Sequence, residues 1–251
     1  MKKFLFVAIA AGALFGASAR AAPPTAPMFN WSGFYVGANA GSAWTKAPLQ
    51  FISGSATPAD AAAENRAGTL DLKDSAFVGG IQGGFNWQSG PVLIGAEIDY
   101  DSLRARLQQG PALFPFGSNP ALMFNLTQTV TTNWLLTARP RIGYATNGAL
   151  VYATGGLAVT KLHYGLAFID TSGGAAGEGT TFSKTKVGWT AGGGFELALA
   201  NNWTFKTEYL HVQFGGESVV GVNGAGEPNV HVISRLTADI VRAGINYRFG
   251  H

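Results

Sequence analysis

The sequence predicts an all-β fold, namely an eight-stranded antiparallel up-and-down transmembrane β-barrel. Three observations predict it. Apolar and polar residues alternate with period two over segments of strand length. Long and short connections between these segments follow one another in strict order. Aromatic residues gather near the segment ends, as they do where barrel strands meet the two faces of a bilayer.

The N-terminal segment predicts export. Residues 1–21 are expected to form a signal peptide for the Sec pathway, 22–30 a periplasmic linker and 31–249 the barrel domain. Lys2 and Lys3 precede an apolar run, and overlapping A-x-A sites end at Ala19 and Ala21, so cleavage after either residue stays open. A membrane anchor is the alternative, but the run is shorter than the roughly 20 apolar residues that a spanning helix needs.

Composition excludes several classes of protein. Without Lys2, Lys3 and Arg20 the 17 basic residues fall to 14, which balance the 14 acidic residues. Balanced charge with no basic run argues against a nucleic-acid partner. The absence of cysteine from the sequence excludes disulfides, thiolate metal sites and a cysteine nucleophile. No run of 18 apolar residues follows the signal, so no transmembrane helix is predicted.

The alternating segments define the expected strands. They cover residues 34–44, 77–87, 92–101, 134–144, 150–161, 187–197, 203–209 and 241–249. The outward face of 150–161 stays open, because both of its faces are apolar or small. Long loops are predicted at 46–75, 103–129, 163–183 and 215–234, and tight turns at Ser89-Gly90, Asn147-Gly148 and Asn201-Asn202.

The lengths of these segments fit a bilayer. Strands of roughly 9 to 11 residues, tilted by about 45°, cross the hydrocarbon layer. Every backbone N–H and C=O group needs a partner there, so a spanning sheet must close on itself. Short turns at one rim and long loops at the other are typical of outer-membrane barrels, and an even strand number returns both chain ends to the turn side.

Aromatic residues predict two interfacial belts. Near the turn rim we expect the girdle to contain Trp31, Phe34, Trp87, Trp203, Tyr247 and Phe249, and near the loop rim Trp44, Trp134 and Trp189. Aromatic residues of a soluble sandwich core are the alternative, and those would favour mid-strand positions.

Charged residues occupy the positions that alternate with the apolar ones. We expect them to form a lumen network of Glu97, Asp99, Asp101, Arg139, Arg141, Glu196, Lys206, Glu208, Arg242 and Arg248. Eight strands leave an interior just wide enough for side chains, so these groups are predicted to plug the lumen by pairing across it. A narrow pore for small solutes is the alternative.

Several segments resemble a known family. They are NWSGFYVGANAG at 30–41, GGIQGGFNWQ at 79–88, VYATGGLA at 151–158, GWTAGGGFE at 188–196 and VRAGINYRF at 241–249. Together they are similar to the small outer-membrane β-barrel proteins of alphaproteobacteria, called outer-membrane immunogenic or porin-family proteins. The resemblance implies a barrel like the OmpA membrane domain and a structural, surface-exposed, antigenic role. Tyr247 and Phe249 look like the signal read by the barrel-assembly machinery, although Gly250 and His251 follow them.

No catalytic, cofactor or metal site is expected. His163, His211, His231 and His251 lack zinc-ligand spacing, and the glycine clusters lie inside strands with no helix after them. The enzymatic alternative is a lipid-modifying barrel using His211 near Glu208. The soluble alternative is a lipocalin-like carrier, whose polar and apolar faces would be reversed.

The expected function is structural. The protein is predicted to lie in the outer membrane, to contribute to envelope integrity and to display four loops at the surface. Expected partners are outer-membrane lipid, lipopolysaccharide and the barrel-assembly machinery, and a monomer is favoured.

Overall fold

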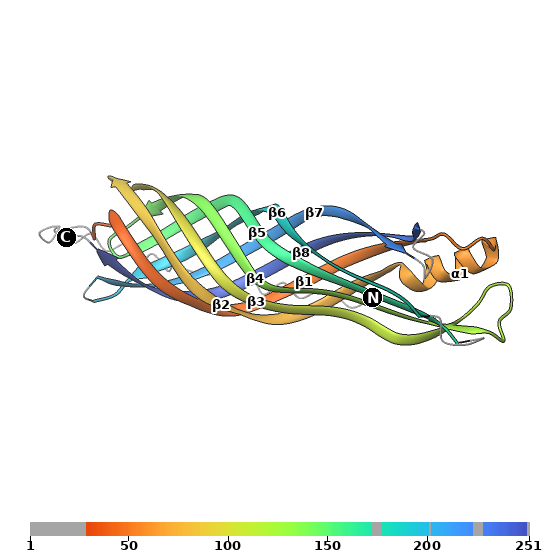
Figure 1. Ribbon diagram of the computed structural model, residues 1–251. Helices are drawn as coiled ribbons and strands as arrows, with labels where there is room; N and C mark the ends of the chain where they lie inside the picture. Colours follow the sequence, from red (N-terminus) through yellow and green to blue (C-terminus); the bar gives the residue numbers. More distant parts are fainter. Residues whose placement is uncertain (1–28, 172–176, 201, 223–227, 250–251) are drawn as a thin grey trace, which may run out of the picture.

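The computed structural model describes residues 29–171, 177–200, 202–222 and 228–249 (Figure 1). The predicted signal peptide and most of the predicted linker lie outside these residues. Within the described ranges, no helix is both long and apolar enough to cross a membrane.

Eight antiparallel strands close into a barrel, as the sequence predicts. Each strand pairs with its neighbours in the chain, and the last pairs with the first, with Phe34 opposite Phe249. The strands are β1 (Gly33–Ser53), β2 (Leu70–Ser89), β3 (Val92–Pro115), β4 (Met123–Ala145), β5 (Ala149–Asp170), β6 (Gly177–Ala198), β7 (Trp203–Val222) and β8 (Pro228–Phe249).

The strands are about twice as long as the bilayer requires. They contain 20 to 24 residues, so most of each predicted long loop is in fact strand. The prediction of loops at 46–75, 103–129, 163–183 and 215–234 is wrong in this respect. Period-two alternation continues through these segments, but the apolar residues move from the outward to the inward face. A prediction that looks for strands with an apolar outward face therefore misses these parts of the strands.

The first of these segments also contains a helix, α1 (Pro58–Gly68), at the barrel end that carries the long connections (Figure 1). Pro58 suits the first turn, where no N–H donor is needed. Asp60 accepts hydrogen bonds from the backbone N–H and the hydroxyl of Ser118, and these bonds lower the pKa of its carboxyl. Glu64, Ala67 and Gly68 near its C-terminal end are buried, with Gly68 close to Phe51, so one side of α1 packs onto the loop end of the barrel.

The other barrel end has short turns. The first turn consists of Gly90 and Pro91, one residue later than predicted, because β2 extends through Ser89. Gly90 and Gly148 have positive φ angles of 58° and 109°, which glycine adopts at little cost. Asn202, with φ of 66°, is in the third turn, and Asn201 lies outside the described residues.

On β3 the inward and outward positions alternate throughout, but the chemistry of the two faces is exchanged partway up; on β4 a register shift between Thr132 and Leu135 also moves the buried positions from even to odd numbers. On β3, Ile98 and Tyr100 face outward and Glu97 and Asp99 inward. Above them on the same strand, Arg104 is exposed and Leu103 is buried inside. The predicted arrangement, with apolar side chains outside and charged ones inside, is therefore confined to the turn half. The interior of the loop half is mainly apolar, although Gln128 and Thr132 are also buried there, and its exterior carries charged side chains such as Arg106.

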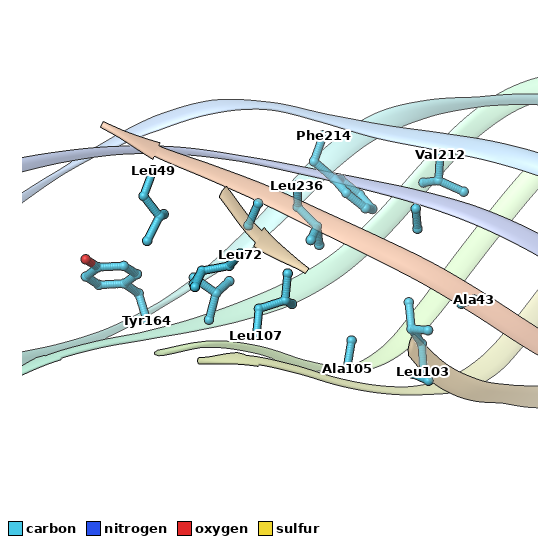
Figure 2. Packing of buried hydrophobic residues seen from close by; sticks show 14 of the residues in the cluster. Ala43, Leu49, Leu72, Leu103, Ala105, Leu107, Tyr164, Val212, Phe214 and Leu236 are labelled. Atoms are coloured by element: carbon cyan, nitrogen blue, oxygen red, sulfur yellow. The ribbon is translucent and has the colours of Figure 1, made fainter. Parts of the chain in front are cut away.

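Figure 2 shows this apolar interior, in which side chains from several strands meet inside the barrel. It includes Ala43, Leu49, Leu72, Leu103, Leu107, Phe124, Leu126, Tyr164, Val212, Phe214 and Leu236. The open question about 150–161 is also settled, since Val151 and Leu157 face outward while Tyr152 and Ala158 are buried.

Candidate functional site

The polar lumen lies in the turn half of the barrel and is built by facing strands. Antiparallel pairing places Glu97 opposite Arg139, Glu196 opposite Lys206 and Glu208 opposite Arg242. Each of these six side chains is buried. Cross-strand register therefore brings opposite charges together before any contact across the lumen is considered.

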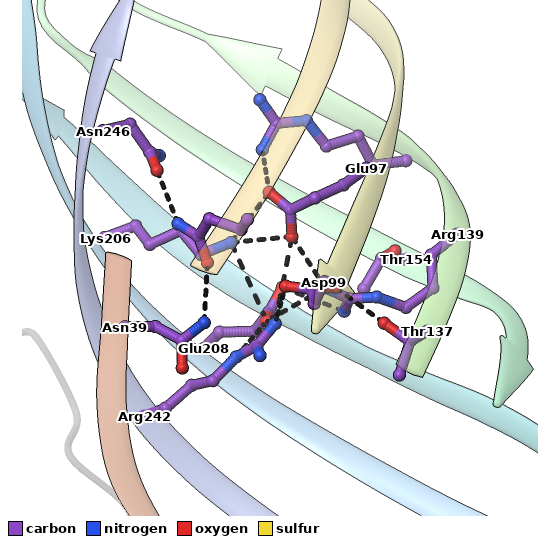
Figure 3. A network of polar contacts seen from close by, with 12 residues as sticks. Asn39, Glu97, Asp99, Thr137, Arg139, Thr154, Lys206, Glu208, Arg242 and Asn246 are labelled. Atoms are coloured by element: carbon purple, nitrogen blue, oxygen red, sulfur yellow. Dashed lines mark hydrogen bonds and ion pairs between the residues drawn. The ribbon is translucent and has the colours of Figure 1, made fainter. Parts of the chain in front are cut away.

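Glu97 is the centre of the network (Figure 3). Its carboxylate oxygens lie 2.7 Å from Arg139 Nη2, 2.7 Å from Lys206 Nζ and 3.6 Å from Arg141 Nη1. The Tyr35 hydroxyl donates a further hydrogen bond at 2.7 Å. Lys206 thus reaches across the lumen to Glu97, although its register partner is Glu196.

Arg242 joins three other carboxylates. Its guanidinium nitrogens lie 2.5 Å from Asp99, 2.7 Å from Asp101 and 2.6 Å from Glu208. Arg139 also reaches Asp99 and Glu208, at 2.7 and 3.1 Å. Since an isolated buried charge is very costly, these multiple contacts are what allow the groups to stay buried.

Arg141 lies between two tyrosine rings. Its guanidinium carbon is 4.7 Å from the ring centre of Tyr35 and 5.2 Å from that of Tyr152. Asn86 accepts a hydrogen bond from Nε, and Glu196 lies 3.4 Å from Nη1. Flat rings on both faces and acceptors at the edge fix the side chain in one position.

Two glycines leave room for the rings of Tyr35 and Tyr152. A Cβ atom at Gly84 would clash with the Tyr35 ring and hydroxyl, and one at Gly194 would clash with those of Tyr152. Because neither residue has a Cβ atom, each tyrosine can lie flat against the wall and donate to a carboxylate. Tyr35 donates to Glu97, and Tyr152 donates to Glu208 at 2.9 Å.

Arg248 stands apart from the other nine predicted network residues. Its guanidinium lies 4.3 Å from the Phe29 ring centre, and Nη1 is 3.5 Å from the Ser32 carbonyl oxygen. It belongs to the turn rim, so its prediction as a network member is corrected. Its position near the chain end places it below the other charges.

Uncharged residues of the network were missed by sequence reasoning. They are Tyr35, Asn39, Gln82, Asn86, Thr137, Tyr152, Thr204 and Asn246. Each occupies the same inward parity as the charges on its strand, and that parity was the signal that could have identified them. Asn246, for example, donates to Glu196 at 2.9 Å, and its outward neighbours are apolar.

The carboxylates of Glu97, Asp99 and Glu208 come close enough for one metal ion to contact all three. Arg139 already forms ion pairs with all three. Lys206 and Arg242 contribute further positive charge to the same carboxylates. The chain's own cations therefore balance this acidic group, and its geometry is accounted for without a metal.

Trp31 is not part of the aromatic girdle. It is fully buried in a second apolar cluster with Leu93, Leu150 and Tyr152, and its backbone N–H donates to Gln88 at 2.7 Å. The correction has a simple cause, because Trp31 precedes β1 and strand parity does not govern its side chain. The chain thus folds this ring into the turn-side mouth.

The other predicted girdle residues lie on the outer wall. Phe34, Trp44, Trp87, Trp189, Trp203 and Phe249 are exposed, and Trp134 and Tyr247 are half-buried. Trp134 stacks on Tyr100, and Tyr247 contacts Trp203 and Phe249 edge to face. Between the two belts the wall carries Val36, Ile81, Ile98, Leu157 and Ile245, all exposed.

The histidines do not assemble the proposed enzymatic pair. His211 faces outward and its Nδ1 lies 2.8 Å from Asp239, whereas Glu208 is buried in the lumen. The suggestion that Glu208 activates His211 is wrong, since residues three apart on a strand face opposite sides. His163 contacts Ser183 at 2.6 Å. The His231 side chain and His251 lie outside the described part of the chain.

An apolar outer band between aromatic belts, around a polar interior, defines an integral outer-membrane β-barrel protein. Residues 7–249 match the outer membrane protein beta-barrel domain family, and the chain belongs to that family. It lies in the cell outer membrane, as its relatives are named outer-membrane proteins.

Relatives extend over the whole chain. The 31 kDa outer-membrane immunogenic protein of Brucella melitensis is 36% identical, covering 99% of this chain and 100% of its own length. The 22 kDa outer membrane protein of Rhizobium leguminosarum is 26% identical over 76% of this chain and 68% of its own. The crystal structure of OprG from Pseudomonas aeruginosa has a TM-score of 0.50 and 12% identity, covering 87% of this chain and 97% of that one, which shows the fold alone.

Proposed function

We propose that the protein is a structural, non-enzymatic barrel with a closed lumen that contributes to envelope integrity and surface display. One observation carries the proposal. Three successive layers of side chains fill the interior, namely the Trp31 cluster at the turn rim, the charge network above it and the apolar core of the loop half.

Each layer opposes the passage of ions by a different means. The Trp31 cluster and the core of the loop half are mainly apolar and offer few groups that could replace the water around a hydrated ion. In the charge network, Arg139 and Arg242 each pair with at least three carboxylates and Lys206 with two, so a solute would have to separate buried ion pairs. Separating one such partner typically costs about 3–5 kcal/mol.

The loop half supports a role in display. The strands continue well beyond the upper aromatic belt and carry α1 and the β3–β4 connection to the far end of the molecule (Figure 1). The outer wall there is polar, with Lys46, Lys73 and Arg106 exposed. Brucella relatives are named immunogenic proteins, which agrees with exposure at the cell surface.

Planar-bilayer recording tests the closed lumen. The refolded protein is expected to give no stable conductance steps, and an open porin recorded in the same bilayers serves to show that steps are detectable. Large, stable steps from the unaltered protein would contradict the proposal and favour the narrow pore.

The envelope role needs a cellular test. Deleting the gene is expected to lower resistance to detergent and bile salts, and re-expression of the unaltered chain is expected to restore it. Unchanged resistance in the deletion strain would remove the envelope role while leaving the closed barrel intact.

A further inference from the structure

The outer wall of β1, β2 and β3 carries a cluster of cations just above the upper aromatic belt. We call Lys46, Lys73, Arg104 and Arg106 the basic patch. All four side chains are exposed. Lys46 follows the belt residue Trp44 by two positions, Arg104 follows Tyr100 by four, and Lys73 precedes Phe77 by four.

The patch places like charges together. Lys46 and Lys73 stand directly opposite each other in the β1–β2 register. Like charges in that position destabilise a sheet, so the fold gains nothing from this arrangement. Among the described residues, no carboxylate forms an ion pair with any of the four side chains of the patch.

The nearest acids are engaged elsewhere. Asp74 accepts backbone N–H groups of Ser75 and Arg106. Asp239, which attracts Lys46 at longer range, accepts hydrogen bonds from Tyr209 and His211. Asp71 is the exception: it lies two residues from Lys73 on the same outward face and offsets one of the four positive charges, so the patch stays net positive. The patch therefore keeps positive charge that an anion on the outside could neutralise.

The height of the patch identifies the kind of anion. Two strand residues rise about 6.6 Å, less when the strand is tilted, so Lys46 lies within the headgroup layer that borders the hydrocarbon. Flexible lysine side chains can reach along the wall to a phosphate there. A free phosphate in bulk water would have no reason to favour this level.

A hollow adjoins the patch. It measures about 500 Å³ and is lined by Pro48, Leu49, Gln50, Asp71 and Arg235, among others. Pro48 is the register partner of Asp71, next to the Lys46–Lys73 pair, and the β1–β8 ladder is interrupted at Ala47 and Pro48. Hollows of this size hold small ligands, and Arg235, one of the lining residues, adds a fifth cation.

We infer that the basic patch and this hollow bind the phosphorylated sugar headgroup of an outer-leaflet glycolipid. The cations neutralise its phosphates, the hollow receives a sugar ring, and the exposed outer-wall residues Trp44 and Phe77 contact its acyl chains. The inference rests on the membrane orientation that the proposed function requires, and it names a lipid partner for the outer wall.

Native mass spectrometry of the refolded protein, released from detergent micelles, tests the inference. The probe is diphosphorylated lipid A, with dephosphorylated lipid A and phosphatidylglycerol as comparison lipids. The double variant K46Q/K73Q is expected to retain lipid A at least about tenfold less than the unaltered protein. The control R66Q/K161Q removes the same charge from exposed sites on α1 and β5 and is expected to bind normally.

A conservative variant and a folding check keep the test decisive. K46R/K73R is expected to bind lipid A normally, and heat-modifiable migration on SDS gels reports folding of every variant. Equal loss in both double variants, or equal retention of dephosphorylated lipid A or phosphatidylglycerol, would overturn the inference. Failure of the unaltered protein to insert into nanodiscs would instead overturn the proposed function.

Discussion

Glu97 on β3 and Arg139 on β4 stand directly opposite each other, and their side chains form a 2.7 Å ion pair inside the barrel. The same glutamate holds Lys206 from β7, so one carboxylate ties together strands on both sides of the lumen. The charge network is therefore a set of cross-lumen links as well as a plug.

Glu97→Gln is expected to destabilise the barrel by about 3–5 kcal/mol, because it leaves buried cations without their counter-charge. Urea unfolding in lipid vesicles, followed by tryptophan fluorescence, measures the change. The control is Asp71→Asn on the exposed wall, expected to stay within about 0.5 kcal/mol. Similar midpoints for the two variants would show that the ion pairs contribute little.

Trp31→Ala is expected to cost about 3–5 kcal/mol, since it opens a cavity in the cluster with Leu93, Leu150 and Tyr152. Trp87→Ala, on the lipid-facing wall, removes an equal side chain without a cavity and should cost clearly less. The measurement is the temperature at which the folded band on SDS gels converts to the unfolded band, and it is compared between the two variants. A larger loss of stability for Trp87→Ala than for Trp31→Ala would contradict the burial of Trp31 and support its prediction as a girdle residue.

Gly84→Ala and Gly194→Ala are each expected to lower stability by about 1–3 kcal/mol, because the new methyl group would clash with Tyr35 or Tyr152 and also with the backbone carbonyl oxygen of Ala96 or Thr207. Gly83→Ala is the matched control, since a Cβ atom there meets its nearest neighbour at an ordinary 3.5 Å. Equilibrium unfolding in urea is the measurement. If Gly83→Ala proves as costly as Gly84→Ala, backbone effects outweigh the tyrosine contact.

The position of the membrane can be tested with charges on the outer wall. Ile81 lies four residues from both Phe77 and Phe85, and Ile81→Arg should cost about 2–4 kcal/mol, the penalty for arginine at the bilayer midplane. Thr185→Arg, outward on β6 and four residues from Trp189, should cost close to nothing. Unfolding from vesicles gives both values, and equal penalties would move the proposed upper boundary.

Sequence reasoning predicted the strand number, the closed topology and the inward parity of the charges, because alternation with period two reports parity directly. It failed where the alternation gives the side of the sheet on which a residue lies but not what surrounds that side. Leu103 and Arg104 continue the alternation of β3. The inward residue here is the apolar one and the outward residue the charged one, the reverse of Glu97 and Ile98 lower on the strand. Trp31 was misplaced because no strand orients it, and Arg248 because parity does not give height within the lumen.

The neutral members of the network were missed for another reason. Tyr35 and Tyr152 reach carboxylates only because Gly84 and Gly194, on neighbouring strands, leave room for their rings. The residues in these contacts lie between 42 positions apart, for Tyr152 and Gly194, and 62 positions apart, for Tyr35 and Glu97. Strand register brings them together, and a single sequence does not give that register.

The pairing of Phe34 with Phe249 has a consequence for how the polypeptide may be cut and rejoined. The first and last strands pair as neighbours at the turn rim, so the order of strands around the ring does not depend on which strand comes first in the chain. A short peptide joining them would form a fourth hairpin like the other three, and new ends opened between Gly90 and Pro91 would give a permuted chain with the same circle of strands.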